Sequence, residues 1–147
     1  MEDKAPGLCI RPPAYPARYR WLFFAAAWWN WLVAAASLFG DSYIRTALSM
    51  RPSVDALSLQ LSISCICLLG IGYYWVAKDV SKNHAIVRIG LIGKLAVFSI
   101  FLGHAIAGNI PYAFAAPTVI DLIFAILFLE FLLHIRRAER QSRVGPV

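Results

Sequence analysis

Long apolar runs alternate with short polar segments along the chain, and this pattern predicts its elements. Four runs are predominantly hydrophobic, and they cover residues 21–39, 56–77, 85–107 and 117–135. Each run is close to the roughly 20 residues that an α-helix needs to cross the hydrocarbon layer of a bilayer. The pattern therefore predicts four transmembrane helices in one transmembrane domain, residues 21–135.

The segments between the runs set the expected topology. Residues 1–20 form a Pro-containing tail, residues 40–55 a loop, and residues 136–147 a basic tail. The polar turn at residues 78–84 and the uncharged segment at residues 108–116 are shorter than that loop. Because short connections make consecutive helices antiparallel neighbours, we expect an all-α membrane protein, an antiparallel four-transmembrane-helix bundle.

Aromatic and small residues inside the runs suggest how the helices lie. Tyr73, Tyr74 and Trp75 close the second run, and this position is typical of an aromatic belt at the membrane interface. The Trp residues of the first run are interpreted as lipid-facing and packing residues. Small residues allow helices to approach one another closely, and candidates for this role are Gly70, Gly72, Gly90 and Gly93.

The basic residues predict how the helices are oriented. Most of the 14 Lys and Arg residues fall on one side of the predicted membrane, namely Lys4, Arg11, Arg18, Arg20, Lys78, Lys82, Arg88, Arg136, Arg137, Arg140 and Arg143. Arg45 and Arg51 fall on the other side, and Lys94 lies within a span. Cytoplasmic segments carry the excess of Lys and Arg, so both termini are predicted to be cytoplasmic.

Composition supports the membrane class. The chain is 60% hydrophobic and only 15% charged, whereas soluble domains carry about 25% charged residues. The formal net charge is +6. The basic residues flank apolar runs, so we interpret them as contacts with anionic lipid headgroups, and not as a nucleic-acid surface.

Polar side chains inside the predicted spans are the candidate site residues, because lipid offers them no partner. Six lie within the spans: Asn30, Gln60, Lys94, His104, Asp121 and Glu130. Gln60 is near an interface, so the other five are the candidates. A charge at the bilayer centre costs about 2.5–3.5 kcal/mol on insertion scales, and such residues usually face the bundle interior. They are interpreted as a polar cluster that either binds a ligand or fixes the register of the helices.

Depth along the helices leaves two pairings open for Lys94. At about 1.5 Å per residue, Lys94 lies about 13 Å from the start of its span, at a depth similar to that of Asn30. It can pair with Glu130 while His104 pairs with Asp121, or it can pair with Asp121 near mid-membrane. Asp121 and Glu130 lie about 180° apart on one helix, so only one faces the bundle centre. We prefer Asp121, because Glu130 is close enough to the interface to snorkel.

Cofactor-binding patterns are sparse. Haem needs two histidines at one depth on facing helices, but His104 is near the outer face while His84 and His134 are near the inner edge. Haem is therefore disfavoured. The three cysteines form no CxxC motif, and no metal-binding or catalytic motif occurs. We expect no independent enzyme and no metal, and we keep a quinone as a candidate ligand.

Short motifs in the second half suggest a family. They are Gly70-Ile71-Gly72-Tyr73, Lys78-Asp79, Arg88-Ile89-Gly90, Gly93-Lys94, Gly108-Asn109, Asp121-Leu122-Ile123-Phe124-Ala125 and Phe128-Leu129, together with Asn30. Over residues 21–135 the chain resembles small four-helix membrane proteins of the DoxX-like kind. The resemblance implies a bacterial inner-membrane bundle and singles out Asn30, Lys94 and Asp121. Some proteins of that group are linked to quinone-dependent oxidation of sulfur compounds, but this chain has no redox motif for that activity.

Three functions follow from these observations. The first is a non-catalytic accessory protein or a subunit of a larger membrane complex, because the loops are minimal and no catalytic constellation is present. The second is a quinone- or small-molecule-binding protein of a redox system that uses Lys94, Asp121 and His104. The third is a small transporter, which the lack of an acidic residue in the first run disfavours.

Overall fold

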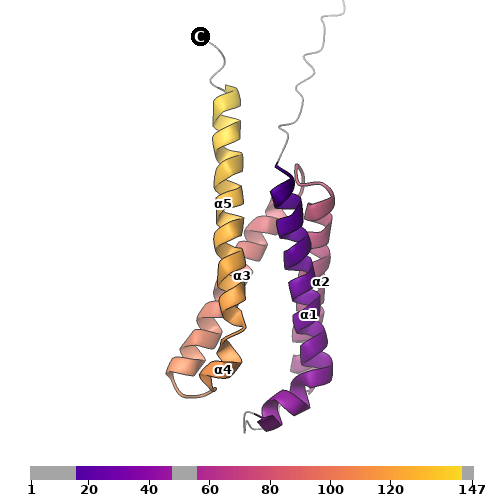
Figure 1. The fold of residues 1–147 in the computed structure, drawn as a ribbon, viewed down its shortest axis with the longest axis vertical. Coiled ribbons are helices and arrows are strands. Elements are labelled where there is room, and N and C mark those ends of the chain that lie inside the picture. Colours follow the sequence, from indigo (N-terminus) through magenta and orange to yellow (C-terminus); the bar gives the residue numbers. More distant parts are fainter. Residues whose placement is uncertain (1–15, 48–55, 144–147) are drawn as a thin grey trace, which may run out of the picture.

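A computed structural model describes residues 16–47 and 56–143 of the chain (Figure 1). The remaining residues lie outside the described part, and they include most of the predicted N-terminal tail and the second half of the predicted 40–55 loop. The described elements are α1 Ala17–Ala47, α2 Ala56–Lys78, α3 His84–Ile106, α4 Tyr112–Ala115 and α5 Thr118–Arg143.

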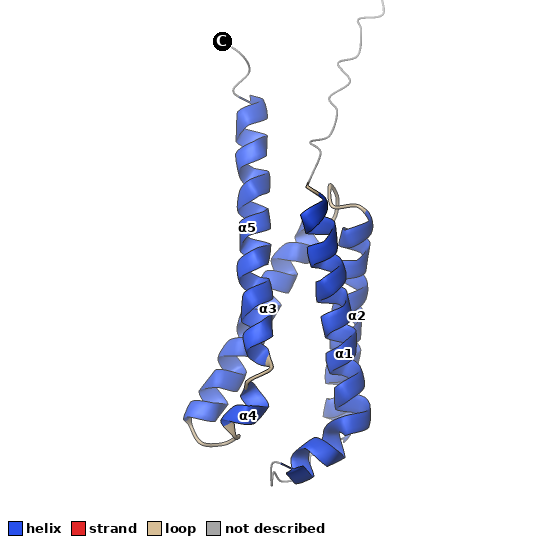
Figure 2. Cartoon of the chain, viewed as in Figure 1, coloured by secondary structure: helices blue, strands red, loops and turns tan. Residues whose placement is uncertain are grey.

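The described residues form helices and loops without strands (Figure 2). Among them, four segments are long and apolar enough to cross a membrane: Ala17–Gly40, Ala56–Lys78, His84–Ile106 and Tyr112–Ala138. This confirms the predicted fold class, an all-α membrane protein with four membrane-crossing helices. The cytoplasmic location of both termini stays a prediction.

Two helices extend further than the apolar pattern indicated. α1 continues through Gly40 to Ala47, so the first part of the predicted loop is helical, and its last turns bend away from the main axis in Figure 1. A single glycine costs a helix only about 1 kcal/mol relative to alanine, and no proline follows within the helix. α5 continues to Arg143, because the residues after the apolar run include the good helix formers Arg and Glu.

The four long helices associate as two pairs. α1 packs along α2, which we call the first pair, and α3 packs along α5, which we call the second pair. The short helix α4 contacts α3 inside the segment predicted as a loop. Figure 1 shows α3 starting beside α2 and crossing to lie beside α4, so the two pairs diverge toward the α4 end.

An apolar core joins the two pairs at the end opposite α4. Its largest fully buried side chains are Tyr73, Phe23, Phe128, Phe131, Val76 and Val87. The rings of Phe23 and Phe128 lie 5.2 Å apart between centroids, and those of Phe23 and Phe131 lie 5.0 Å apart. α1 and α5 are therefore held together by aromatic packing, which favours edge and tilted contacts at such distances.

Tyr73 occupies the centre of this core, and its interpretation as an interfacial belt residue was wrong. Its side chain has no exposed surface. A Cβ added at Gly90 would lie 2.5 Å from the Tyr73 hydroxyl oxygen, so the ring fits against α3 only because Gly90 has no side chain. Tyr73 is near the end of α2, but the helix period places it on the inner face. It is buried because of that face.

The turn between α2 and α3 is closed by side-chain hydrogen bonds. The Asp79 carboxylate accepts hydrogen bonds from the backbone N–H and the hydroxyl of Ser81, and it pairs with Lys82 at 2.9 Å. The hydrogen bonds from Ser81 and the neighbouring Lys82 lower the pKa of Asp79. Asn83 then adopts a left-handed conformation with φ of 62° before α3 begins, a conformation that Asn tolerates better than most residues.

The packing of Tyr73 against Gly90 predicts that alanine is tolerated at one α3 glycine and not at another. Gly90→Ala should lower the free energy of unfolding by about 1–3 kcal/mol, because the buried ring cannot move aside. Gly93→Ala is the control, since its Cβ would meet nothing within 4 Å. That variant should match the wild type or gain up to about 1 kcal/mol of helix propensity. Equal stability of both variants, measured by unfolding in mixed micelles, would contradict this packing.

Candidate functional site

A buried ion pair lies between α3 and α5. The Lys94 ammonium nitrogen lies 2.6 Å from Asp121 Oδ1, and the two side chains are only 6% and 16% exposed. The structure therefore selects Asp121, and not Glu130, as the partner of Lys94. Lys94 is in the middle of α3 and Asp121 is in the first turn of α5, so the long lysine side chain spans the difference in depth.

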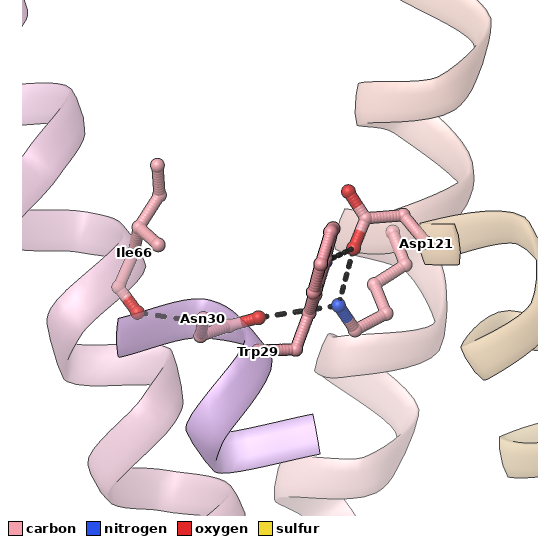
Figure 3. Close-up of polar contacts among 5 residues, drawn as sticks. Trp29, Asn30, Ile66 and Asp121 are labelled. Carbon is pink, nitrogen blue, oxygen red and sulfur yellow. Dashed lines mark hydrogen bonds and ion pairs between the residues drawn. The ribbon is translucent and has the colours of Figure 1, made fainter. Parts of the chain in front are cut away.

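Asn30 connects this ion pair to the first helix pair. Lys94 Nζ donates a hydrogen bond to Asn30 Oδ1 at 3.2 Å, and Asn30 Nδ2 donates to the backbone oxygen of Ile66 at 3.3 Å (Figure 3). A carbonyl oxygen has two lone pairs, so the Ile66 carbonyl can accept this bond in addition to a helix bond. The chain of bonds therefore runs from α2 through α1 and α3 to α5.

Trp29 adds a second link between the two pairs. Its indole Nε1 donates a hydrogen bond to Asp121 Oδ1 at 3.2 Å. Sequence reasoning assigned this Trp to lipid or packing contacts and missed its polar role. The available signal was its position beside Asn30 deep in an apolar run, because a buried indole N–H usually finds an acceptor. We call Trp29, Asn30, Lys94, Asp121 and the Ile66 carbonyl the polar network.

Aromatic rings flank the ammonium group of the polar network. Lys94 Nζ lies 5.1 Å from the centroid of the Phe124 ring and 5.7 Å from that of Tyr73. Cations within about 6 Å of a ring face are attracted by the negative charge density of that face. The rings therefore replace part of the hydration that Lys94 gives up.

Two polar atoms next to the network are not used by it. The Tyr73 hydroxyl is buried and has no hydrogen-bond partner among the described residues. Within the described chain, Trp29 and Lys94 both donate to Asp121 Oδ1, and Figure 3 shows the other oxygen of Asp121 turned away from both hydrogen bonds. These two atoms are the free hydrogen-bonding capacity of the site.

His104 and Glu130 lie away from the polar network. His104 is exposed, and its Nδ1 lies 3.1 Å from Asn109 Nδ2, so the considered pairing of His104 with Asp121 is wrong. Glu130 is exposed and lies 3.5 Å from the Arg18 guanidinium, an ion pair between α5 and α1. The structure thus brings together three of the five candidates, Asn30, Lys94 and Asp121.

The side chains of the network hydrogen-bond to one another and pair one ammonium group with one carboxylate. One positive and one negative charge balance each other inside an apolar bundle. Among the residues that the structure describes, no three His, Cys, Asp or Glu side chains gather closely enough to hold a metal ion. The network contains no thiol, and its carboxylate is already bonded to two donors.

Comparison of the chain with family models, curated proteins and solved structures finds no match in any of the three. The resemblance to DoxX-like proteins therefore stays a prediction. The function has to be argued from the geometry of the network and of the surface around it.

The ion pair predicts strongly coupled effects of substitution. Lys94→Met should cost about 3–5 kcal/mol of stability, because it leaves the Asp121 carboxylate buried without its counter-charge. Lys94→Met combined with Asp121→Leu should recover most of that loss, since a buried ion pair can often be replaced by apolar residues at little cost. Unfolding in mixed micelles measures both variants.

Glu130→Gln is the matched control, because it breaks an ion pair whose side chains are 63% and 54% exposed. Exposed pairs contribute little to stability, so this variant should unfold like the wild type. If the Lys94/Asp121 double variant is as unstable as the Lys94 single variant, the two charges are not coupled in the way we describe.

Proposed function

We propose that this protein is a non-catalytic accessory protein, or a subunit of a larger membrane complex, whose polar network holds two helix pairs in register. The observation that carries the proposal is the closure of the network: Lys94 bonds to both Asp121 and Asn30, and Asn30 bonds back to α2. Side chains that hydrogen-bond to one another across helices hold those helices in place. They also have few donors and acceptors left to bind a substrate.

The position of the network supports a scaffold role. The apolar core lies on the side of the network toward Tyr19, Ala77, Val87 and Ile135. Toward α4 the two pairs diverge, so hydrogen bonds hold them together where apolar packing between them ends. Polar contacts between membrane helices contribute only about 0.6 kcal/mol each on average. An ion pair that also accepts a hydrogen bond from Trp29 and donates one to Asn30 is costlier to break.

The surface fits contact with lipid and with other membrane proteins. Large apolar side chains are exposed on every long helix, including Phe39, Leu61, Ile92 and Ile126. Basic residues at the α5 end, such as Arg136, Arg137 and Arg140, are exposed where anionic headgroups of a cytoplasmic leaflet would meet them. These features support a location in the inner membrane with both termini in the cytoplasm.

Native mass spectrometry of the full chain, gently extracted from its own membrane, tests the proposal. We expect a stoichiometric complex with other membrane subunits or with further copies of this chain. A variant with Lys94→Ala should reduce the amount of that complex, while Glu130→Gln should not. A single chain that carries a stoichiometric small molecule and no partner would contradict the scaffold role.

A second candidate function, binding of a quinone or another small molecule, is favoured by the buried Tyr73 hydroxyl. A buried polar group without a partner costs about 1–3 kcal/mol, and a ligand carbonyl would remove that cost. Tyr73→Phe separates the two functions, because it deletes only the hydroxyl. A scaffold predicts equal or higher stability and an unchanged complex, whereas a binding protein predicts loss of a copurifying quinone, measured by mass spectrometry of extracted lipids.

A further inference from the structure

The first helix pair carries five aromatic rings in continuous contact. Along this series the centroid distances are 6.0 Å for Trp21–Phe24, 5.7 Å for Phe24–Tyr74, 6.1 Å for Tyr74–Trp31 and 5.8 Å for Trp31–Trp28. We call these five residues the aromatic ladder. The ladder packs closely against α2: the Trp31 ring occupies the space that a side chain at Gly70 would fill.

Two cations lie over neighbouring rings of this ladder. The Arg20 guanidinium carbon lies 5.7 Å from the Phe24 centroid, and Lys78 Nζ lies 4.9 Å from the Tyr74 centroid. Because the Phe24 and Tyr74 rings contact each other, the cation of α1 and the cation of α2 lie over adjacent rings of the ladder. The aromatic faces hold both charges in place without neutralising them.

These two cations differ from their neighbours Arg18 and Lys82, which have acidic partners. Arg18 pairs with Glu130, and Lys82 pairs with Asp79. Within the described residues, no acidic side chain forms an ion pair with Arg20 or Lys78, so their charge is available to an external anion. Both residues are exposed.

The site lies at the membrane boundary. Arg20 is in the first turn of α1, and Lys78 is the last residue of α2. Trp21 and Trp28 of the ladder are 71% and 68% exposed, so their rings offer apolar surface that runs from the cations into the membrane-crossing part of α1. The surface is charged at the boundary and apolar below it, like an anionic phospholipid.

We propose that Arg20 and Lys78 form a binding site for the phosphate group of an anionic phospholipid, whose acyl chains lie along the aromatic ladder. The guanidinium fork donates two parallel hydrogen bonds to phosphate oxygens, and the ammonium adds a third donor. The excess positive charge selects lipids whose headgroup carries a net negative charge over zwitterionic ones. This site goes beyond the scaffold role and needs only that the chain is embedded in a bilayer.

Titration of phosphatidylglycerol into the full chain in neutral maltoside micelles tests the site. A neutral micelle has no charged leaflet, so only a local site responds. We expect saturable thermal stabilisation by phosphatidylglycerol and little by phosphatidylcholine. Arg20→Gln with Lys78→Gln should weaken the apparent affinity about 30-fold, since each basic residue near an anionic lipid contributes about a fivefold factor.

Arg136→Gln with Arg137→Gln is the matched control, because it removes the same charge from the far end of α5, away from the ladder. It should change the apparent affinity less than about threefold, well below the effect of two lost contacts. Arg20→Lys with wild-type Lys78 keeps the charge and should keep most of the binding. Retained binding in this variant would show that the double Gln variant loses affinity through its missing charges and not through a change of fold. Equal losses in both double variants, or equal stabilisation by inorganic phosphate alone, would overturn the proposal.

Discussion

A lysine and an aspartate in an apolar bundle can stay charged only if each is the other's partner, and most of this structure follows from that requirement. Lys94 and Asp121 lie 2.6 Å apart with little exposed surface. Breaking such a pair leaves an uncompensated charge at a cost of about 3–5 kcal/mol. α3 and α5 must therefore lie side by side at this depth, and the second helix pair is fixed by its charges as well as by its apolar surface.

The same pair also determines where the first helix pair lies. Asn30 and Trp29 reach from α1 to Lys94 and Asp121, and Asn30 also bonds to the Ile66 carbonyl on α2. All four long helices thus contribute to a single set of hydrogen bonds, and α1 contributes two side chains. On one side of this set lies the apolar core around Tyr73, and on the other side the two pairs diverge. Gly90 matters for this arrangement because it leaves room for the Tyr73 ring, whose centroid lies 5.7 Å from the Lys94 ammonium nitrogen.

Charge is distributed unequally over the end of the molecule that we assign to the cytoplasm. On the side where α1 meets α5, Arg18 is matched by Glu130. On the first helix pair, Arg20 and Lys78 lie over aromatic rings, and neither forms an ion pair within the described residues. A scaffold protein would gain from this difference, because internal ion pairs hold helices together while unmatched cations engage the lipid around them. The lipid site and the polar network share no residue, so substitutions can remove either one and leave the residues of the other unchanged.

The sequence by itself determined the number of membrane-crossing helices, because about 20 apolar residues in a row have no other stable arrangement in a chain so poor in charge. It also identified Asn30, Lys94 and Asp121 as side chains that need partners, since depth along a helix can be counted from the sequence. It did not determine which partners they find. Only the tertiary structure decided that Lys94 pairs with Asp121, that Trp29 and Tyr73 face inward, and that the helices associate as two diverging pairs. The physical reason is that these outcomes depend on how helices rotate and cross, and the direction in which a side chain points toward a neighbouring helix is set by packing among all of them.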